Sequence, residues 1–260
     1  MDTQTAANAQ NAQNAQVASS GLLAKLHAFK SRGPVPPRIL FSLEGHDARL
    51  IEHDLRDIMD MINAAVNACT PLLEERPPLP DMYGKKCNMN RNVGFFANPE
   101  QSYGYFYSKQ LSVAKPPPEA MQELLETINK RFKAQFNGVL VNEYTSGLDY
   151  ISDHSDDEHG LDPSIGVLAI SWGAERIFRI KRKGVSGSAY DAWTKPYHAL
   201  LMAGADFQSK LTHGVPASKK VSGRRVSITF RMHNKALEEP LYQAWLKAQS
   251  KKRAREEAQE

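Results

Sequence analysis

Residues 224–232 read RRVSITFRM, and this stretch, together with SIGVLAISWG at residues 164–173, decides the fold. In the first stretch Val226, Ile228 and Phe230 alternate with polar side chains, the period of a strand that buries one face. Strand-like patterns recur, with glycines in or beside the turns between them, at residues 136–144, 175–183, 197–204 and 210–215. Six short strands with turn signals predict a β-sandwich or a barrel-like jelly roll.

Helical patterns precede these strands. Apolar residues recur at helical spacing over residues 46–68, where Asp47 can cap the start, and again over residues 119–134, directly after three prolines. Residues 93–96 and 102–108 alternate apolar and polar side chains like strands. The expected fold class is α+β, with a jelly-roll core and flanking N-terminal helices.

The ends of the chain differ in composition from its centre. Residues 5–16 repeat Asn-Ala-Gln, so residues 1–37 are expected to form a disordered tail and linker. Residues 38–236 would form the globular domain, and residues 237–260 a C-terminal charged helix and tail. A helix is expected over residues 238–250, and the KKRAREEAQE that follows is either its fraying end or a nuclear-import-like basic cluster.

Composition sets limits on the class of protein. Of the 260 residues, 41% are hydrophobic, which suffices for a core, yet no stretch has the length of a transmembrane helix, so no membrane partner is expected. The N-terminus lacks a signal-peptide pattern, and Cys69 and Cys87 are scattered, which together predict an intracellular protein of the nucleus or cytoplasm. The sequence predicts no oligomeric state.

Charge is unevenly distributed along the chain. Residues 142–175 hold eight acidic residues and no Lys or Arg, whereas residues 176–233 hold twelve Lys or Arg and two Asp. The basic segment suggests DNA or RNA as a partner, because polyanion binding rests on such cations; a solvated surface of mixed charge is the alternative. Candidate phosphate contacts are Lys181, Arg182, Lys183, Lys219, Lys220 and Arg224.

His154, Asp156 and His213 carry the metal chemistry. His154 and Asp156 stand at i and i+2 on an extended segment and therefore project to one face. Two imidazoles and one carboxylate are the ligand set of a non-haem Fe(II) site that keeps positions open for substrate and oxygen. Catalytic zinc is the alternative metal.

Arg225 and Arg231 lie six residues apart on the alternating strand and therefore point the same way. An arginine on that face could hold a dicarboxylate by a bidentate, charge-assisted pair. The alternative for Arg225 is a surface cation beside Arg224.

Residues 142–231 resemble the AlkB family of Fe(II)/2-oxoglutarate dioxygenases. The resemblance rests on pieces that occur in order: Asn142-x-Tyr144-x-x-Gly147-x-Asp149-x-Ile151-x-x-His154-x-Asp156-x-Glu158, Ser171-x-Gly173, Arg176-x-Phe178, Leu201-Met202-x-Gly204, His213-x-Val215-Pro216 and Arg225-x-Ser227-x-Thr229-x-Arg231. Several members carry Asn where this chain has Ser227, whose shorter hydroxyl weakens the assignment of that residue.

The resemblance implies a double-stranded β-helix, the jelly-roll core. It implies Fe(II) held by His154, Asp156 and His213, and 2-oxoglutarate held by Arg225 and Arg231 with help from Asn142, Tyr144 and Ser227. With O2 as oxidant, it implies oxidative demethylation of bases such as 1-methyladenine or 3-methylcytosine, releasing formaldehyde, succinate and CO2.

The substrate base would be held by aromatic side chains, because enzymes that modify a base take it out of the stack and sandwich it. Tyr103, Tyr105 and Tyr107 are expected on one strand face, and Tyr105 and Tyr107 are the candidates, opposite the ring of His154; packing in the core is the alternative. Glu158 could orient the substrate or a group that supports the metal ligands. Arg91, in a polar loop over residues 88–94, could contact the nucleotide as part of a lid.

Two rival functions stay open. The first is an oxygenase of the same chemistry acting on protein or a small molecule. The second is a non-catalytic nucleic-acid-binding module that kept the fold, against which the intact metal and arginine set argues.

Overall fold

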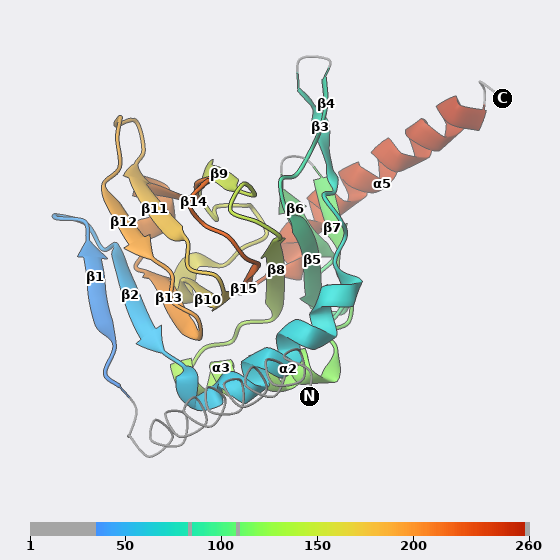
Figure 1. The fold of residues 1–260 in the computed structure, drawn as a ribbon. Coiled ribbons are helices and arrows are strands. Elements are labelled where there is room, and N and C mark those ends of the chain that lie inside the picture. Colours follow the sequence, from blue (N-terminus) through green and yellow to red (C-terminus); the bar gives the residue numbers. More distant parts are fainter. Residues whose placement is uncertain (1–34, 83–84, 108–109, 258–260) are drawn as a thin grey trace, which may run out of the picture.

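Two antiparallel sheets face each other at the centre of the molecule, in a computed structural model that describes residues 35–82, 85–107 and 110–257 (Figure 1). The larger sheet has the order β1 (Arg38–Ser42), β2 (Arg49–Asp54), β13 (His198–Ala203), β10 (Val167–Gly173), β15 (Arg225–Arg231), β8 (Gly138–Tyr144) and β5 (Asn92–Ala97). The smaller has the order β12 (Tyr190–Trp193), β11 (Ile177–Arg182), β14 (Leu211–Val215) and β9 (Ile151–His154). Facing antiparallel sheets confirm the predicted jelly roll, and the six predicted strands are β8, β10, β11, β13, β14 and β15.

Strand β15 shows how alternation separates core from site. Val226, Ile228 and Phe230 point to one face and are buried in the main hydrophobic cluster. The polar residues between them point to the other face and line a pocket between the sheets. Successive strand side chains alternate between faces, so one strand supplies both a core and a polar site.

Two helices cover the outer face of the larger sheet (Figure 1). Helix α2 (Met59–Cys69) buries Ile62 and Val66, and helix α3 (Glu119–Phe132) buries Leu124 and Ile128, against the same cluster that holds the apolar side of β15. Fully burying one such side chain stabilises a fold by about 1.5 to 3 kcal/mol. The helices thereby fix the sheet whose opposite face carries the pocket.

The helix expected over residues 46–68 is wrong in its first part. Residues 49–54 form strand β2, which pairs with β1 on one side and β13 on the other. The carboxylate of Asp47 caps no helix and instead accepts a hydrogen bond from the backbone N–H of Ala205 at 3.2 Å. A 3-10 turn at η1 (Arg56–Ile58) then leads into α2. Pairing on both edges outweighs a local helical pattern, because a strand inside a sheet satisfies all of its backbone groups.

Shorter elements complete the fold. Strands β6 (Gly104–Tyr107) and β7 (Gln110–Val113) form a hairpin beside β5. Strands β3 (Pro78–Met82) and β4 (Lys85–Asn88) form a second hairpin, which projects beyond them at the top of Figure 1. The remaining elements are η2 (Thr70–Leu72), η3 (Pro163–Ile165), α4 (Phe207–Lys210) and α5 (Lys235–Glu257). Helix α5 begins before the expected residue 238 and continues through the KKRAREE stretch, so that stretch is helical as far as Glu257.

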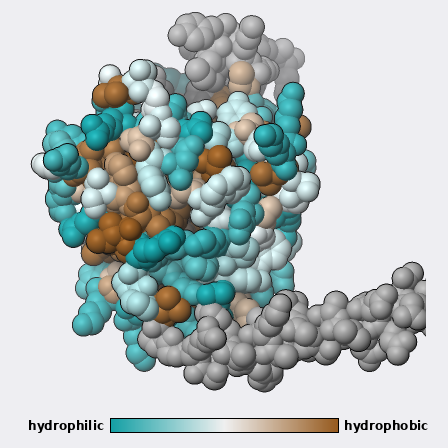
Figure 2. All heavy atoms as spheres, turned by 60° about the vertical axis from the view of Figure 1, so that its left-hand side comes forward, coloured by the Kyte–Doolittle hydropathy of each residue, from teal (hydrophilic) through white to brown (hydrophobic). Residues whose placement is uncertain are grey.

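The expected tail over residues 1–37 lies almost wholly outside the described residues, and the domain limits stay predictions. Among the helices of the described part, none is long and apolar enough to cross a membrane. The face turned to the viewer in Figure 2, on the β1 and β12 side, is mainly hydrophilic with several hydrophobic areas. Exposed Ile39, Val185 and Trp193 lie on or beside these strands.

Candidate metal centre and its pocket

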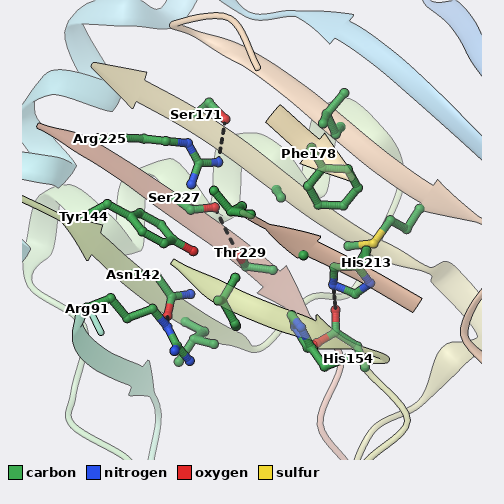
Figure 3. Close-up of a pocket in the computed structure, with 18 of the residues that line it drawn as sticks. Arg91, Asn142, Tyr144, His154, Ser171, Phe178, His213, Arg225, Ser227 and Thr229 are labelled. Carbon is green, nitrogen blue, oxygen red and sulfur yellow. Dashed lines mark hydrogen bonds and ion pairs between the residues drawn. The ribbon is translucent and has the colours of Figure 1, made fainter. Parts of the chain in front are cut away.

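The predicted metal ligands meet at one end of the smaller sheet. Strands β9 and β14 pair antiparallel with His154 directly opposite His213, and the two ring centroids are 4.3 Å apart. Asp156 follows two residues after the end of β9, and one ligand atom from each of the three residues lies within 4.8 Å of the others. Figure 3 shows both imidazoles converging at one side of the pocket. The pairing of β9 with β14 thus brings together residues that are far apart in the sequence.

The protonation states of this triad suit metal binding. Burial alone would raise the pKa of Asp156, but the positive charge of Arg231, with the two imidazoles, outweighs it and holds the pKa at about 2. Burial, together with the neighbouring His154, lowers the pKa of His213 to about 3, and burial also lowers the pKa of His154. A charged carboxylate and two neutral imidazoles are the forms that ligate a metal.

Asp156 is held from two further directions. Its backbone N–H donates to the side-chain oxygen of Gln208 at 2.9 Å, and its Oδ1 accepts from Arg231 Nη2 at 2.5 Å. Its Oδ2 faces His213 Nε2 at 3.5 Å and has no hydrogen-bond partner among the described residues. Gln208, on α4, is a positioning residue that the sequence did not predict. Its role depends on the fold, which brings α4, directly before β14, next to Asp156.

Arg225 lines the same pocket (Figure 3). It lies on the same face of β15 as Arg231, which also lines the pocket, as the alternation predicted. It is 2% exposed, donates from Nη2 to the hydroxyl of Ser171 at 3.1 Å, and lies 5.1 Å from the ring centre of Tyr144. Its Nε and Nη1 are buried and have no hydrogen-bond partner within the described part of the chain. The alternative of a surface cation is therefore wrong.

The unmatched donors of Arg225 fit an anionic co-substrate. Burial lowers the pKa of this guanidinium because the charged form is desolvated. Buried charged groups are normally paired, since an unpaired buried charge lowers the stability of the folded state by roughly several kcal/mol. A carboxylate accepting from two guanidinium donors would meet this need.

Arg231 contacts both Asp156 and Tyr105. Besides its bond to Asp156, its guanidinium carbon lies 4.7 Å from the ring centre of Tyr105. The buried carboxylate raises the pKa of Arg231 even though burial opposes this, so the side chain stays charged. Its Nε and Nη1 are unmatched among the described residues, so it can still donate to a ligand.

The other predicted co-substrate residues line the same pocket. Asn142 and Tyr144 come from β8, and Ser227 comes from β15. Asn142 Oδ1 accepts from Arg91 Nε at 2.7 Å, while the Ser227 hydroxyl is 3.5 Å from that of Thr229. The pocket encloses roughly 560 Å³ of empty space, its open mouth included.

The four predicted substrate residues are placed differently. Tyr105 and Arg91 line the metal pocket, and Arg91 is 5% exposed, so its side chain points inward instead of spreading over a lid. Glu158 lies behind Tyr105, whose hydroxyl donates to Glu158 Oε1 at 2.7 Å, and borders a separate small pocket. Tyr107 ends β6, and its side chain lies outside the described residues.

Tyr103 and Tyr105 meet different surroundings. The ring of Tyr103, just before β6, stacks on Tyr242 of α5 at a centroid distance of 4.1 Å. Burial and the charge of Asp156 raise the pKa of Glu158, beside Tyr105, to about 7. Of these two tyrosines, only Tyr105 lines the metal pocket.

A structural arginine supports the loops around the metal. Arg176 is 1% exposed and donates to the backbone carbonyls of Ser146, Asp149 and Pro216. Ser146 and Asp149 precede β9, and Pro216 follows β14. One guanidinium therefore links the segment that leads to His154 with the segment that follows His213. The sequence showed the residue but not this role.

The candidate phosphate contacts divide into two groups. Lys181 and Lys183 pair with Asp153 at 2.7 Å and Asp157 at 3.0 Å, and Arg224 pairs with Glu143 and lies over Trp172. Arg182, Lys219 and Lys220 are exposed on turns or strand ends. The phosphate role of all six stays a prediction.

Comparison with known proteins places this site in a family. A profile described as the 2OG-Fe(II) oxygenase superfamily matches residues 55–231, more than half of the chain. The chain is 27% identical over 176 residues to the Arabidopsis thaliana DNA oxidative demethylase ALKBH2 and 32% identical over 133 residues to the Homo sapiens protein of that name. These matches cover 58% and 49% of this chain and 55% and 51% of the relatives.

The chain thus spans about half the length of the curated relatives it matches. A solved structure described as that of OsALKBH1 superposes with a TM-score of 0.47 and 16% identity, over 75% of this chain and 100% of that one, a likeness too low to carry an argument. The profile match ends at Arg231 and includes every pocket residue described above, so the chain belongs to the 2OG-Fe(II) oxygenase superfamily, in which its sequence relatives are AlkB-type enzymes.

Proposed function

We propose that this protein uses Fe(II), 2-oxoglutarate and O2 to remove alkyl groups oxidatively from N-alkylated bases of nucleic acid, with DNA as the substrate. One observation carries the proposal: a His-Asp-His triad and a buried arginine with two unmatched donors share one pocket. Metal ligation and dicarboxylate binding side by side are what this oxygenase chemistry needs.

The residues present fit the implied groups. His154, Asp156 and His213 would hold Fe(II), and the buried Oδ2 of Asp156 faces the triad without a hydrogen-bond partner in the described part. Arg225 would pair with one carboxylate of 2-oxoglutarate through its unmatched Nε and Nη1. Tyr144, Asn142 and Ser227 would shape the same co-substrate site, with Arg231 at its metal end.

When bound, iron and 2-oxoglutarate would supply the oxidising power from O2, with succinate and CO2 as products, and the N-methyl carbon would be oxidised and released as formaldehyde. The chain's own residues do the positioning. Arg231 keeps Asp156 ionised through its bond at 2.5 Å, and Gln208 fixes the backbone of Asp156. Phe178 stacks on His213 at a centroid distance of 5.3 Å and shields it from water.

Tyr105 is the residue best placed to contact a base, because its ring, on strand β6, lines the metal pocket next to the guanidinium of Arg231. The ring of His154 would be on the other side of that base. Arg91, held by Asn142, would contact the nucleotide from the pocket wall. Glu158 would act through the hydroxyl of Tyr105, and Tyr107 stays a candidate on the sequence pattern alone.

The substrate class rests on the names of the relatives and on the basic segment. Both relatives are called DNA oxidative demethylases, so DNA is proposed ahead of RNA. Nuclear or cytoplasmic location remains an expectation from the sequence.

The test is anaerobic addition of Fe(II) and 2-oxoglutarate, then air, to the protein with an oligonucleotide carrying 1-methyladenine or 3-methylcytosine, followed by mass spectrometry. We expect loss of one methyl mass that requires both additives and is abolished in Asp156→Ala. Succinate formed without any change of the oligonucleotide would move the substrate to protein or a small molecule. No succinate and no binding of Fe(II) or 2-oxoglutarate would indicate a non-catalytic binding module.

A further inference from the structure

Helix α5 is joined to the domain by a buried acid in its first turn. Glu238 is 1% exposed, accepts from the backbone N–H of Tyr103 at 2.7 Å and from the hydroxyl of Ser102 at 3.0 Å, and lies 2.8 Å from His233 Nδ1. Three anchoring contacts around one carboxylate fix the direction in which the helix leaves the domain. The base of α5 therefore belongs to the rigid part of the molecule.

An aromatic ladder runs from this anchor along the helix. The rings of Tyr103 and Tyr242 stack at 4.1 Å with an interplanar angle of 8°, and the ring of Trp245 follows that of Tyr242 at 6.0 Å and 17°. Residues three apart on a helix share a face, so Tyr242 and Trp245 align. Tyr103 stands two residues before Tyr105, which lines the metal pocket. The ladder thus starts beside the strand that borders the site and leads away from it.

The outer half of α5 is basic and lacks an apolar stripe. Figure 1 shows the helix extending away from the sheets and the two hairpins. Residues 241–257 contain five Lys or Arg and two acidic residues, Glu256 and Glu257 at the end of the helix, and Lys247, Lys251 and Arg253 are exposed. Beyond Trp245 the apolar residues as far as Glu257 are Leu246 and two alanines. A helix with so little apolar surface is poorly suited to pack against a second copy or a partner helix.

We propose that the ladder of Tyr103, Tyr242 and Trp245, with the cations beyond it on α5, is a second binding site that holds the single-stranded nucleic acid flanking the base in the metal pocket. This inference rests on the proposed function for the identity of the strand. Aromatic rings on which bases stack, combined with a line of positive charge, are how proteins bind single strands without reading their sequence. The distance along the helix axis from residue 242 to residue 255 is about 20 Å, at a rise of 1.5 Å per residue.

Charge decides between the possible occupants. Five cations without an acidic residue over residues 241–255 complement a phosphate backbone. The half-buried indole of Trp245 offers a ring at the end of the stack, where a base can continue it. An acidic protein partner would pair with the cations only, and an apolar one would contact the rings only. A nucleic acid strand would contact both, through its phosphates and its bases.

The test measures binding of unmethylated single-stranded DNA by fluorescence anisotropy, which does not depend on catalysis. The probe is about 20 nucleotides long, more than the roughly 4 to 16 that one such platform covers. Trp245→Ala should weaken binding about tenfold, and Trp245→Phe should retain most of it, because stacking on one ring is worth about that much. Lys251→Gln with Arg253→Gln should lower the salt slope by about 1.4, at about 0.7 per phosphate contact on a single strand.

Leu246→Ala is the matched control, since Leu246 is the next residue on the helix and is 36% exposed. It should bind like the parent protein, and circular dichroism should show equal helix content in all variants. Intrinsic fluorescence should be quenched by the strand in the parent protein, with much less quenching in Trp245→Phe. Equal affinity of Trp245→Ala and the parent protein, or an equal loss in Leu246→Ala, would overturn the inference.

Demethylation of a short oligonucleotide, of about three nucleotides, separates this inference from the proposed function, because only one nucleotide flanks the modified base on each side and little strand remains for the ladder. The ladder variants should demethylate it at the parental rate. Failure of the parent protein on this probe would count against the proposed function, while the binding data on the longer strand would still decide the ladder.

Discussion

Arg224 and Arg225 are adjacent in the sequence and have opposite fates in the fold. Arg225 is 2% exposed inside the pocket, whereas Arg224 points to the other side of β15 and pairs with Glu143. Alternation along a strand forces this separation. The pair therefore provides a variant and a control that differ by one position.

We expect Arg225→Gln to weaken 2-oxoglutarate binding by about 30-fold or more, because truncating one member of a buried, hydrogen-bonded charge pair costs about 2 to 5 kcal/mol. Arg224→Gln should change it little. Absorbance titration of the Fe(II)-loaded protein under anaerobic conditions measures both. Equal affinities in the two variants would contradict the assignment of the co-substrate carboxylate to Arg225.

Arg231 makes a different prediction, because its bond at 2.5 Å holds the pKa of Asp156 at about 2 against the effect of burial. In Arg231→Gln the burial that remains should raise the pKa of Asp156. A protonated carboxyl binds metal poorly, so metal affinity should fall more steeply with acidification than in the parent protein.

Metal titrations at about pH 7.5 and about pH 5.5 test this. The charge of Arg231 also helps to lower the pKa of His154 and His213, so its loss should raise these values too, and protonation of the histidines adds to the fall in metal affinity in the same direction. Arg225→Gln is the control, because Arg225 is not bonded to Asp156, and its pH dependence should match the parent. Parallel pH profiles for Arg231→Gln and the parent protein would show that another group keeps Asp156 ionised.

At the scale of elements, local pattern predicts most strands but misjudges one segment. Residues 224–232 alternate so regularly that strand β15 follows from the sequence, with both of its faces. Residues 49–54 belong to the segment 46–68 with helical spacing and yet form β2, because β1 and β13 supply backbone partners on both sides. Neighbours that are distant in the sequence decide such cases, and no local pattern contains them.

The two cysteines give a prediction about α2. Cys69 ends this helix, is fully buried, and burial raises the pKa of its thiol to about 12, while Cys87 on β4 is exposed. Since the thiolate is the reactive form, a thiol reagent should label Cys87 quickly and Cys69 only after unfolding. Mass spectrometry of the native and urea-treated protein counts the labels. Two rapid labels in the native protein would mean that α2 opens locally.

At the scale of the whole molecule, the site could be predicted as a list of residues but not as an arrangement. The ligand triad and both arginines follow from the sequence, because their spacing and their strand are visible there. The contacts of Gln208 with Asp156 and of Arg176 with three loop carbonyls depend on how α4 and the loops fold back. Glu158 shows the same limit, since the sequence placed it near the site and the fold puts it behind Tyr105.

The pocket between the two sheets contains buried polar atoms without hydrogen-bond partners in the described part of the chain, which predicts that bound ligands raise the stability of the protein strongly. Arg225, Arg231 and Asp156 all have buried polar atoms without hydrogen-bond partners among the described residues. Fe(II) and 2-oxoglutarate would each bind the folded state, and at 100 times its dissociation constant one such ligand adds about 2.7 kcal/mol to the free energy of unfolding. At about 2 to 4 °C per kcal/mol for a domain of this size, the Tm should rise by about 5 to 10 °C.

Anaerobic thermal unfolding with and without the two ligands measures this rise, and His154→Ala is the informative variant. His154 is half-buried at the end of β9, so its removal should leave the Tm of the ligand-free protein within about 2 °C of the parent. It should also abolish the rise caused by Fe(II), because a ligand is lost. A full rise of the Tm with Fe(II) in His154→Ala would place the metal elsewhere. A rise of the Tm with 2-oxoglutarate alone, lost in Arg225→Gln, would show that the arginine and the triad bind their ligands independently.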